Sequence, residues 1–508
     1  MASAGQEHGG TFAPDIGTTP VGARRFEARI ESVLGQFAVM QLVLACSGVV
    51  RNKVVALRLG PAAFGEVAQI AALMGVASSL VSFGMAVSLS RNAARATALG
   101  ERQRLLSNAN GIVFGLSAVA VASAVTLLFT GRLLPLAGLS HTGTAAVACL
   151  IFIAAIPLEG VKNNFLSLLQ GIMDVRGLAF GRSAAVLLAT VLSVPVVWFL
   201  GVPGAALQFL MLSAFAALLL GWRCHALGYA PAAVRLDRPL VARLATFGMV
   251  SLASAFAQNL SDAAVRTSLI EKAGAAANGL LQAPFVLSIT VRGILLASIG
   301  SVSLAAIGPR TDRKEVSAVV NGMLGAVLPA GVLALGVLGL LGSYALTLLY
   351  SSAFAPGAAL FPFILSADLL VAAAWVVGAP LLAFGDKAIW LALDLLYAAL
   401  RLVLAMALVD RLGSTAVVLG YLGAAGVHLA LNLAVYRFRY RLAVEARNLF
   451  AIAGGAALVA AFSWAGTRAG LAPAPILPLS IAVWTAMAVL HARRIGLLRA
   501  VVTRFTGR

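Results

Sequence analysis

Long apolar stretches recur along almost the whole of this chain. Of its 508 residues, 61% are hydrophobic and only 11% are charged, and the mean hydropathy is +0.98. A soluble domain is about half apolar and about a quarter charged. The stretches are continuous rather than alternating, which favours membrane-spanning helices over strands. The sequence therefore predicts an all-α integral membrane protein with about fourteen transmembrane helices between residues 34 and 492.

The positive charge of the chain is explained by its placement. Lysine and arginine number 37 against 18 acidic residues, a formal net charge of +19. If the N-terminus is cytoplasmic, most of these basic residues fall on one side of the membrane, as the positive-inside rule requires. This pattern predicts a multi-pass protein of the cell inner membrane with both termini cytoplasmic. It gives no reason to expect a nucleic-acid partner.

The spans predict two lobes. We expect a cytoplasmic disordered tail at 1–33, an N-lobe of six helices at 34–223, a cytoplasmic connector at 224–243, a C-lobe of six helices at 244–436, and two further helices with a cytoplasmic tail at 437–508. No connection is long enough to hold a catalytic domain. No nucleophile–base pair, metal cluster or phosphate-binding loop appears, so we expect no enzyme activity, metal or cofactor.

A short pattern occurs in both predicted lobes. Residues 49–65 read VVRNKVVALRLGPAAFG and residues 263–279 read AAVRTSLIEKAGAAANG. Arginine is costly in hydrocarbon, so one near the end of a helix in each lobe indicates an anion-attracting interior between two repeats. With a one-residue slip between the arginine and the first glycine, the match pairs Arg51, Gly60 and Gly65 with Arg266, Gly274 and Gly279.

Some charged side chains within the predicted helices have a neighbour of opposite charge. Glu159 and Lys162 are three residues apart, which allows either a local ion pair or a hydrophilic stripe facing the interior. Asp262 and Arg266 are four residues apart, so they form either a structural pair or part of a site. Both alternatives stay open for both pairs.

Arg292 has no acidic residue within helical reach. An arginine deep in a span is a candidate functional residue, and we interpret it as an anion contact that stays unpaired. Pairing with another helix, or extension of the side chain toward the membrane surface, is the alternative.

A further helix carries polar residues on one face. Trp390, Asp394, Tyr397 and Arg401 recur at helical spacing, which suits contact with a sugar or packing against another helix. His428 is a candidate for ion coupling, although a hydrogen-bonded packing histidine explains it as well. The complete set of ion-coupling candidates is Glu159, Asp262, Asp368, Asp394 and His428.

These segments resemble a known family. The turn LGPAAFG and the following glycine-rich end FGMAVSLSR are similar to the opening helix pair of polysaccharide and O-antigen flippases. Those proteins belong to the multidrug/oligosaccharidyl-lipid/polysaccharide exporter superfamily. The fragments TLLYSSAFAPGAALFPFILSADLL and PLLAFGDKAIWLAL resemble its ninth-to-eleventh helix region, and the likeness extends over about residues 35–440.

The resemblance implies two six-helix bundles around a central cavity, here followed by two additional C-terminal helices. It implies transport of undecaprenyl-pyrophosphate-linked oligosaccharide by alternating access, for export of O-antigen, capsule or exopolysaccharide. It also implies that cationic residues of the first, seventh and eighth helices bind the pyrophosphate, which points to Arg51 or Lys53, Arg266 and Arg292. Lys162, Trp390 and Arg401 complete the candidate contacts to pyrophosphate or sugar.

The expected partners are the lipid-linked oligosaccharide, membrane lipids, and the polysaccharide polymerase and chain-length proteins. Two other functions are alternatives. A multidrug/cation antiporter of the same superfamily would favour acidic residues in its cavity, whereas the buried charge without a local partner here is Arg292. A membrane polysaccharide polymerase would need a large loop and a catalytic constellation, and the sequence offers neither.

Overall fold

The computed structural model describes residues 20–139, 142–229, 236–307 and 312–468. Within these ranges the regular structure is entirely helical, and eleven helices are long and apolar enough to cross a membrane. The expectation of an all-α, multi-pass membrane protein is confirmed. The expected span at 474–492 lies outside the described residues, so the full helix count stays a prediction.

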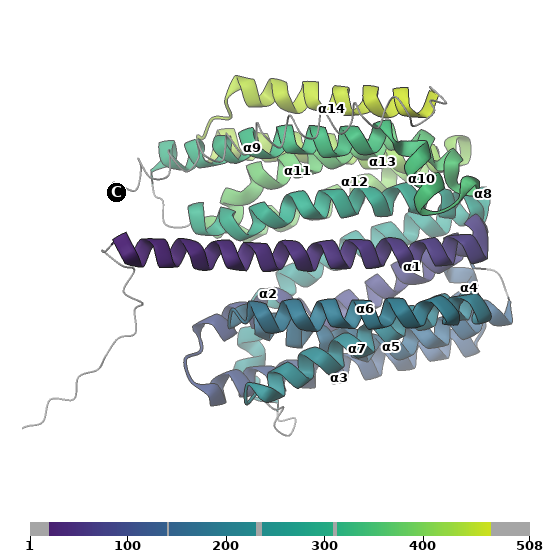
Figure 1. The fold of residues 1–508 in the computed structure, drawn as a ribbon, viewed down its shortest axis with the longest axis horizontal. Helices are drawn as coiled ribbons and strands as arrows, with labels where there is room; N and C mark the ends of the chain where they lie inside the picture. Colours follow the sequence, from purple (N-terminus) through teal and green to yellow (C-terminus); the bar gives the residue numbers. More distant parts are fainter. Residues whose placement is uncertain (1–19, 140–141, 230–235, 308–311, 469–508) are drawn as a thin grey trace, which may run out of the picture.

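The helices fall into two groups that are visible in Figure 1. One, the N-terminal helix group, comprises α1 (Pro20–Ser82), α2 (Met85–Arg95), α3 (Leu99–Phe129), α4 (Leu133–Leu136), α5 (Gly143–Gly171), α6 (Val175–Leu200) and α7 (Val202–Ala226). The other, the C-terminal helix group, comprises α8 (Arg238–Ile307), α9 (Arg313–Leu340), α10 (Gly342–Leu349), the 3₁₀-helix η1 (Ser352–Leu360), α11 (Phe361–Ala383), α12 (Lys387–Leu412), α13 (Ser414–Ala434), the π-helix η2 (Val435–Arg439) and α14 (Ala446–Arg468).

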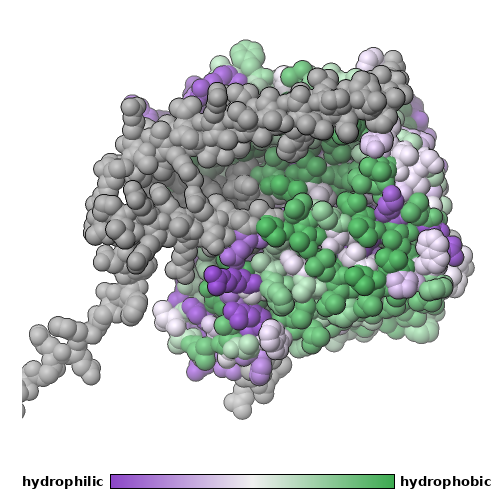
Figure 2. Space-filling view, in the orientation of Figure 1, coloured by the Kyte–Doolittle hydropathy of each residue, from purple (hydrophilic) through white to green (hydrophobic). Residues whose placement is uncertain are grey.

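Apolar side chains cover most of the coloured surface in Figure 2, and hydrophilic ones gather toward its left-hand end. Such a surface is stable against lipid tails and would be unstable in water. Within the C-terminal helix group, α11 packs against α8, α9, α13 and α14, and most of its span is buried. A polar side chain on α11 therefore faces other helices rather than lipid.

Two long helices are interrupted by one glycine each. Gly60 in α1 has φ 70° and ψ −179°, and Gly274 in α8 has φ 84° and ψ 162°. This region of backbone conformation is open essentially to glycine alone, because a Cβ would clash with the chain. The two kinks stand at the positions that the sequence repeat pairs with each other.

The second glycine of the repeat lies at the contact between the groups. A Cβ built on Gly65 would lie 2.0 Å from the Ala275 carbonyl oxygen, and one built on Gly279 would lie 1.9 Å from the Pro61 carbonyl oxygen. Just beyond the end of α1, a Cβ on Gly84 would lie 2.0 Å from the Gly248 carbonyl oxygen of α8. The segment of α1 after its kink therefore packs backbone to backbone against α8, which only glycine allows.

One ion pair ties the start of α12 to the end of the span formed by α13 and η2. The Asp386 carboxylate, just before α12, accepts hydrogen bonds from Arg439 Nε at 2.9 Å and from the Tyr440 hydroxyl at 2.5 Å. Arg439, followed by Tyr440, lowers the pKa of Asp386 to about 2 because both favour the ionised carboxylate. The start of α12 is thereby anchored to the chain that follows α13.

Some boundaries differ from those expected. The sequence predicts a disordered tail as far as residue 33, but α1 begins at Pro20. Residues 20–33 are polar yet rich in arginine, glutamate and alanine, which are good helix formers, and hydropathy alone does not detect them. The expected connector at 224–243 is also shorter, since α7 continues to Ala226 and α8 begins at Arg238.

Candidate functional site

A cavity of about 600 Å³ lies wholly within the C-terminal helix group. Its walls come from α8, on both sides of the kink, and from α11, α12 and α13. Its polar and aromatic lining is Ser251, Ser254, Gln258, Asn259, Asp262, Arg266, Phe285, Arg292, Trp375, Trp390, Asp394, Tyr397, Arg401, Tyr421 and His428. A cavity of this size, with a few converging polar groups, is typical of a small-molecule site.

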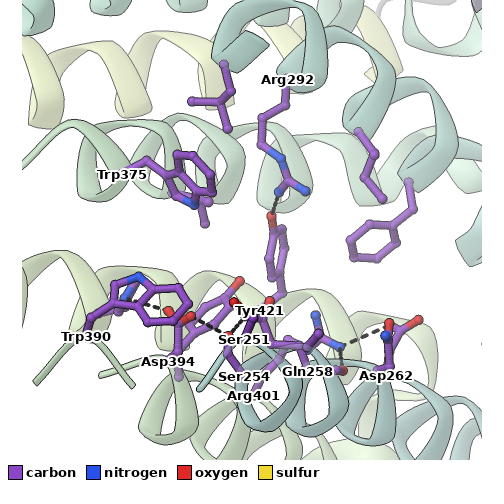
Figure 3. A pocket seen from close by; sticks show the side chains of 18 of the residues that line it. Ser251, Ser254, Gln258, Asp262, Arg292, Trp375, Trp390, Asp394, Arg401 and Tyr421 are labelled. Carbon is purple, nitrogen blue, oxygen red and sulfur yellow. Dashed lines mark hydrogen bonds and ion pairs between the residues drawn. The ribbon is translucent and has the colours of Figure 1, made fainter. Parts of the chain in front are cut away.

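Asp262 holds two arginines on one wall of the cavity. Its Oδ2 accepts a hydrogen bond from Arg266 Nε at 3.0 Å, one helical turn away on α8. Its Oδ1 accepts one from Arg401 Nη2 at 3.1 Å, across from α12 (Figure 3). The local pair allowed by the sequence is present and extends to a second helix. Two guanidinium groups thus converge on one carboxylate, an arrangement that also suits a phosphate.

Arg292 lies on the opposite wall, where it is paired. Its Nη1 donates to the carboxylate of Asp368 on α11 and to the hydroxyl of Tyr421 on α13. Tyr421 in turn donates to Asp368 at 2.5 Å, and Ser288 donates to the same carboxylate. The expectation of an unpaired arginine was wrong, because its partners come from other helices. Asp368 is fully buried behind it, while Arg292 is partly exposed to the cavity.

Aromatic side chains flank the remaining part of the cavity. Trp375 on α11 and Trp390 on α12 lie on opposite sides of the open space in Figure 3. Near Trp390, the Asp394 carboxylate accepts a hydrogen bond from Ser254 at 2.6 Å and lies 3.9 Å from His428 Nε2. Flat apolar faces beside a carboxylate and hydroxyls offer stacking and hydrogen bonding together.

The cavity therefore has no net formal charge. The three guanidinium groups of Arg266, Arg292 and Arg401 are matched by the carboxylates of Asp262, Asp368 and Asp394. Asp262 pairs with Arg266 and Arg401, and Asp368 pairs with Arg292, so each of the three buried guanidinium groups has a carboxylate partner. An entering anion must compete with a carboxylate for its arginine.

Four of the predicted site residues lie outside this cavity, in the N-terminal helix group. Arg51 donates to the Thr190 hydroxyl on α6 at 3.3 Å, and Lys53 donates to the Leu348 carbonyl on α10 at 2.6 Å. Glu159 pairs with Lys162 at 2.5 Å and accepts a hydrogen bond from Ser213 at 2.6 Å. The two arginines of the repeat, Arg51 and Arg266, do not converge on one site. In contrast, Arg266, Arg292, Trp390, Arg401 and four of the ion-coupling candidates line the cavity or lie directly behind it.

Trp375, Tyr421 and Asn278 are among the residues of the site and its surroundings that sequence reasoning missed. Trp375 stands seven residues after Asp368 on the same helix face, and that spacing was a usable signal. Tyr421 and Asn278 sit in apolar or small-residue segments and become significant only through contacts between helices.

Comparisons with known proteins agree on family and fold. The model of a family described as polysaccharide biosynthesis protein matches residues 36–306. No curated protein sequence matches the chain. Among solved structures, the lipid II flippase MurJ in an inward closed conformation has a TM-score of 0.70 at 12% identity, covering 93% of this chain and 99% of its own.

A multidrug resistance MATE family transporter of the MOP superfamily, in an inward-facing conformation, has a TM-score of 0.62 at 17% identity, with 80% of this chain and 98% of that chain covered. A MOP superfamily transporter from Pyrococcus furiosus, noted for the reverse polarity of its binding pocket, has a TM-score of 0.57 at 16% identity, with 80% and 95% covered. At these identities the likeness shows the fold, which is that of MOP transporters. The family expected from the sequence is confirmed by the family model.

Proposed function

We propose that this chain, which belongs to the polysaccharide biosynthesis protein family, is a flippase for undecaprenyl-pyrophosphate-linked oligosaccharide in the bacterial inner membrane. It would act by alternating access, with both termini cytoplasmic, and serve the export of a surface polysaccharide. The observation that carries the proposal is the cavity with converging arginines beside two tryptophans in a protein of this family. A pyrophosphate bearing sugars cannot cross hydrocarbon without such a polar path.

The pyrophosphate is assigned to the wall that holds Arg266 and Arg401. Both guanidinium groups already point at the oxygens of Asp262 at hydrogen-bonding distance. A phosphate oxygen can take the same donors bidentately, because guanidinium stays charged and has a rigid fork of N–H groups. Arg292 would approach from the opposite wall.

The first sugar is assigned to the space between Trp375 and Trp390. Both side chains reach the cavity, and Ser254 and Asp394 lie on the same wall as Trp390 to bond hydroxyl groups. An oligosaccharide is larger than this cavity, so the N-terminal helix group would supply additional contacts. Arg51, Lys53 and Lys162 stay the candidates there.

Ion coupling is assigned first to Asp394 and His428. A proton on His428 would turn the 3.9 Å approach into an ion pair, whereas the neutral ring leaves Asp394 with Ser254 only. Asp262, Asp368 and Glu159 are secondary candidates, because each already has a basic partner.

The proposal is tested by reconstituting the purified protein in vesicles that contain a fluorescent undecaprenyl-pyrophosphate oligosaccharide. We expect the label to become accessible in the opposite leaflet. Vesicles that contain the labelled lipid but no protein should show no such change. A new covalent product would instead indicate a polymerase. Absence of both would contradict a flippase. A polysaccharide polymerase and chain-length proteins are the proposed users of the delivered substrate.

A multidrug/cation antiporter is the second candidate, and a specific observation favours it. Three carboxylates line or back the cavity, and Arg292 is neutralised by one of them. The charge-based reason to disfavour an antiporter therefore no longer holds. Efflux of a cationic dye from the same vesicles, with no movement of the labelled lipid, would establish this alternative.

A further inference from the structure

Asn278 connects the cavity to the contact between the two helix groups. It lies on α8 four residues after the kink at Gly274 and is fully buried. Its Nδ2 donates to the Gly65 carbonyl on α1 at 2.8 Å, and its Oδ1 accepts from Arg266 Nη1 at 3.2 Å. One side chain therefore touches both the backbone of the other group and an arginine of the cavity.

The orientation of this amide is fixed by its two partners. A guanidinium group has only donors and a carbonyl has only an acceptor, so a flipped amide would satisfy neither. The hydrogen bonds continue through Arg266 to Asp262 and then to Arg401 of α12, on the same wall of the cavity. They thus run without interruption from the Gly65 carbonyl across the cavity lining.

The series of hydrogen bonds ends at Gly65, where the backbones of α1 and α8 are in direct contact. A Cβ on Gly65 or on Gly279, the residue after Asn278, would collide with backbone of the opposite helix. The bond from Asn278 Nδ2 to the Gly65 carbonyl is 2.8 Å long, so a displacement of Gly65 away from α8 that exceeds hydrogen-bonding distance breaks it. A close-packed contact of this kind favours two discrete arrangements over gradual deformation.

We propose that Asn278 is a positioning residue that couples the occupancy of Arg266 to the contact between α1 and α8 at Gly65. An anion that draws Arg266 toward the cavity takes a donor away from Asn278, which is buried and finds no replacement in place. The amide then reorients or moves, and its bond to the N-terminal helix group is lost. Coupling of this kind requires a shared element whose state both sites influence. The proposal rests on the proposed function in taking the anion to be the phosphate of the substrate.

The experiment uses the full chain in lipid nanodiscs with one spin label on each helix group. Arg132→Cys and Arg411→Cys provide exposed label sites, and the native cysteines are replaced by Cys46→Ser, Cys149→Ala and Cys224→Ala. Inorganic pyrophosphate is the probe. Its affinity is measured by calorimetry, and the distance between labels by pulsed electron resonance.

Pyrophosphate is expected to shift the distance distribution of the parent protein. In Asn278→Ala we expect affinity within about threefold of the parent, equivalent to about 0.7 kcal/mol, and no shift in distance. Asn448→Ala is the matched control, since Asn448 is a buried asparagine that bonds Asn321 between α14 and α9. It should shift as the parent does. If pyrophosphate shifted the distances in Asn278→Ala as much as in the parent protein, the proposal would be overturned. The proposal would also be overturned if Asn278→Ala and Asn448→Ala both lost pyrophosphate binding and the distance shift.

A second arm needs no ligand and separates this proposal from the proposed function. Arg266→Gln removes the guanidinium group and should shift the distances when Asn278 is present but not in the Asn278→Ala background. Equal effects in the two backgrounds would refute the coupling. If the parent protein fails to bind pyrophosphate while this arm gives the expected difference, the anion assignment fails and the coupling stands.

Discussion

At the scale of single residues, the pair of Arg292 and Asp368 decides how the site can be tested. The Asp368 carboxylate is fully buried, and Arg292 is its only cationic partner among the described residues. Removing one member of a buried pair typically costs about 3–5 kcal/mol, because the other charge is left without compensation. If a variant of only one of these residues lost transport, the loss could come from an unstable protein or from a damaged site, and the single variant would not distinguish them.

Arg292→Ala should lower the amount of protein in the membrane, whereas Arg292→Ala combined with Asp368→Asn should restore it. Transport should stay absent in both, if Arg292 contacts the substrate. Membrane level by immunoblot and export of surface polysaccharide are the two measurements. Arg447→Ala, which breaks an exposed pair with Glu445, serves as the neutral control. Equal levels in the single and double variants would contradict the structural role.

Asp262→Asn should tighten anion binding. The carboxylate occupies the donors of Arg266 and Arg401 that a phosphate would use, and it is partly exposed to the cavity. Removing the competing charge should lower the Kd for inorganic pyrophosphate by about tenfold, which corresponds to about 1.4 kcal/mol. Calorimetry on the purified protein measures this change, and a weaker affinity would mean that Asp262 supports the site rather than competes for it.

Pairing along a helix was predictable at this scale, and pairing between helices was not. Asp262 and Arg266 are four residues apart, so their contact follows from helical geometry. Arg292 and Asp368 are 76 residues apart, and only the packing of α8 against α11 joins them. Trp390 and Arg401 were found because they repeat on one face of α12. The same reasoning could not tell that Arg51 faces α6 rather than the cavity.

At the scale of elements, the two glycine kinks set the course of α1 and α8. Gly274→Ala should destabilise the protein by about 1–3 kcal/mol, since alanine is strained at this positive φ and extended ψ. No atom lies within 4 Å of the added Cβ, so the cost comes from the backbone and not from a clash. Thermal unfolding in detergent measures it.

Gly115→Ala is the matched control for this prediction. Gly115 lies inside α3, and a Cβ there also meets nothing within 4 Å. Alanine should be neutral or slightly stabilising at that site because it is the better helix former. Equal stability of the two variants would show that the kink at Gly274 carries no strain.

The repeated turn was predictable because LGPAAFG and AGAAANG place glycines at the same spacing. Hydropathy also located the spans, since apolar length is what a membrane helix requires. The helical extension of α1 before residue 34 could not be found in this way, because its residues are polar. The start of α1 thus follows the helix propensity of its residues, in a segment where the hydropathy pattern gives no signal.

At the scale of the whole molecule, the glycine contact between the helix groups is expected to form and break during transport. Gly279→Ala would place a methyl group 1.9 Å from the Pro61 carbonyl oxygen, so α1 and α8 must move apart. We expect this variant to populate a separated state even without ligand. The label pair at positions 132 and 411 would report it as a changed distance distribution.

Gly426→Ala on α13, where a Cβ meets no neighbour, should leave the distribution unchanged. If Gly279→Ala also left it unchanged, the contact would not limit the relative position of the groups. Neither outcome could be anticipated from the sequence, because the match of Gly65 with Gly279 shows a repeat but not that the two residues face each other.

The balanced charge of the empty cavity determines how the membrane voltage acts on the proposed cycle. Voltage does work on net charge that moves, about 2.3 kcal/mol per elementary charge per 100 mV. Three arginines matched by three aspartates would return across the field without electrical work. A bound pyrophosphate adds negative charge, so the loaded step would carry current, whereas the step that returns without substrate would carry none unless His428 binds a proton. Electrometry on supported membranes should therefore record a transient current when substrate is added and none during the return of the empty protein while His428 is neutral.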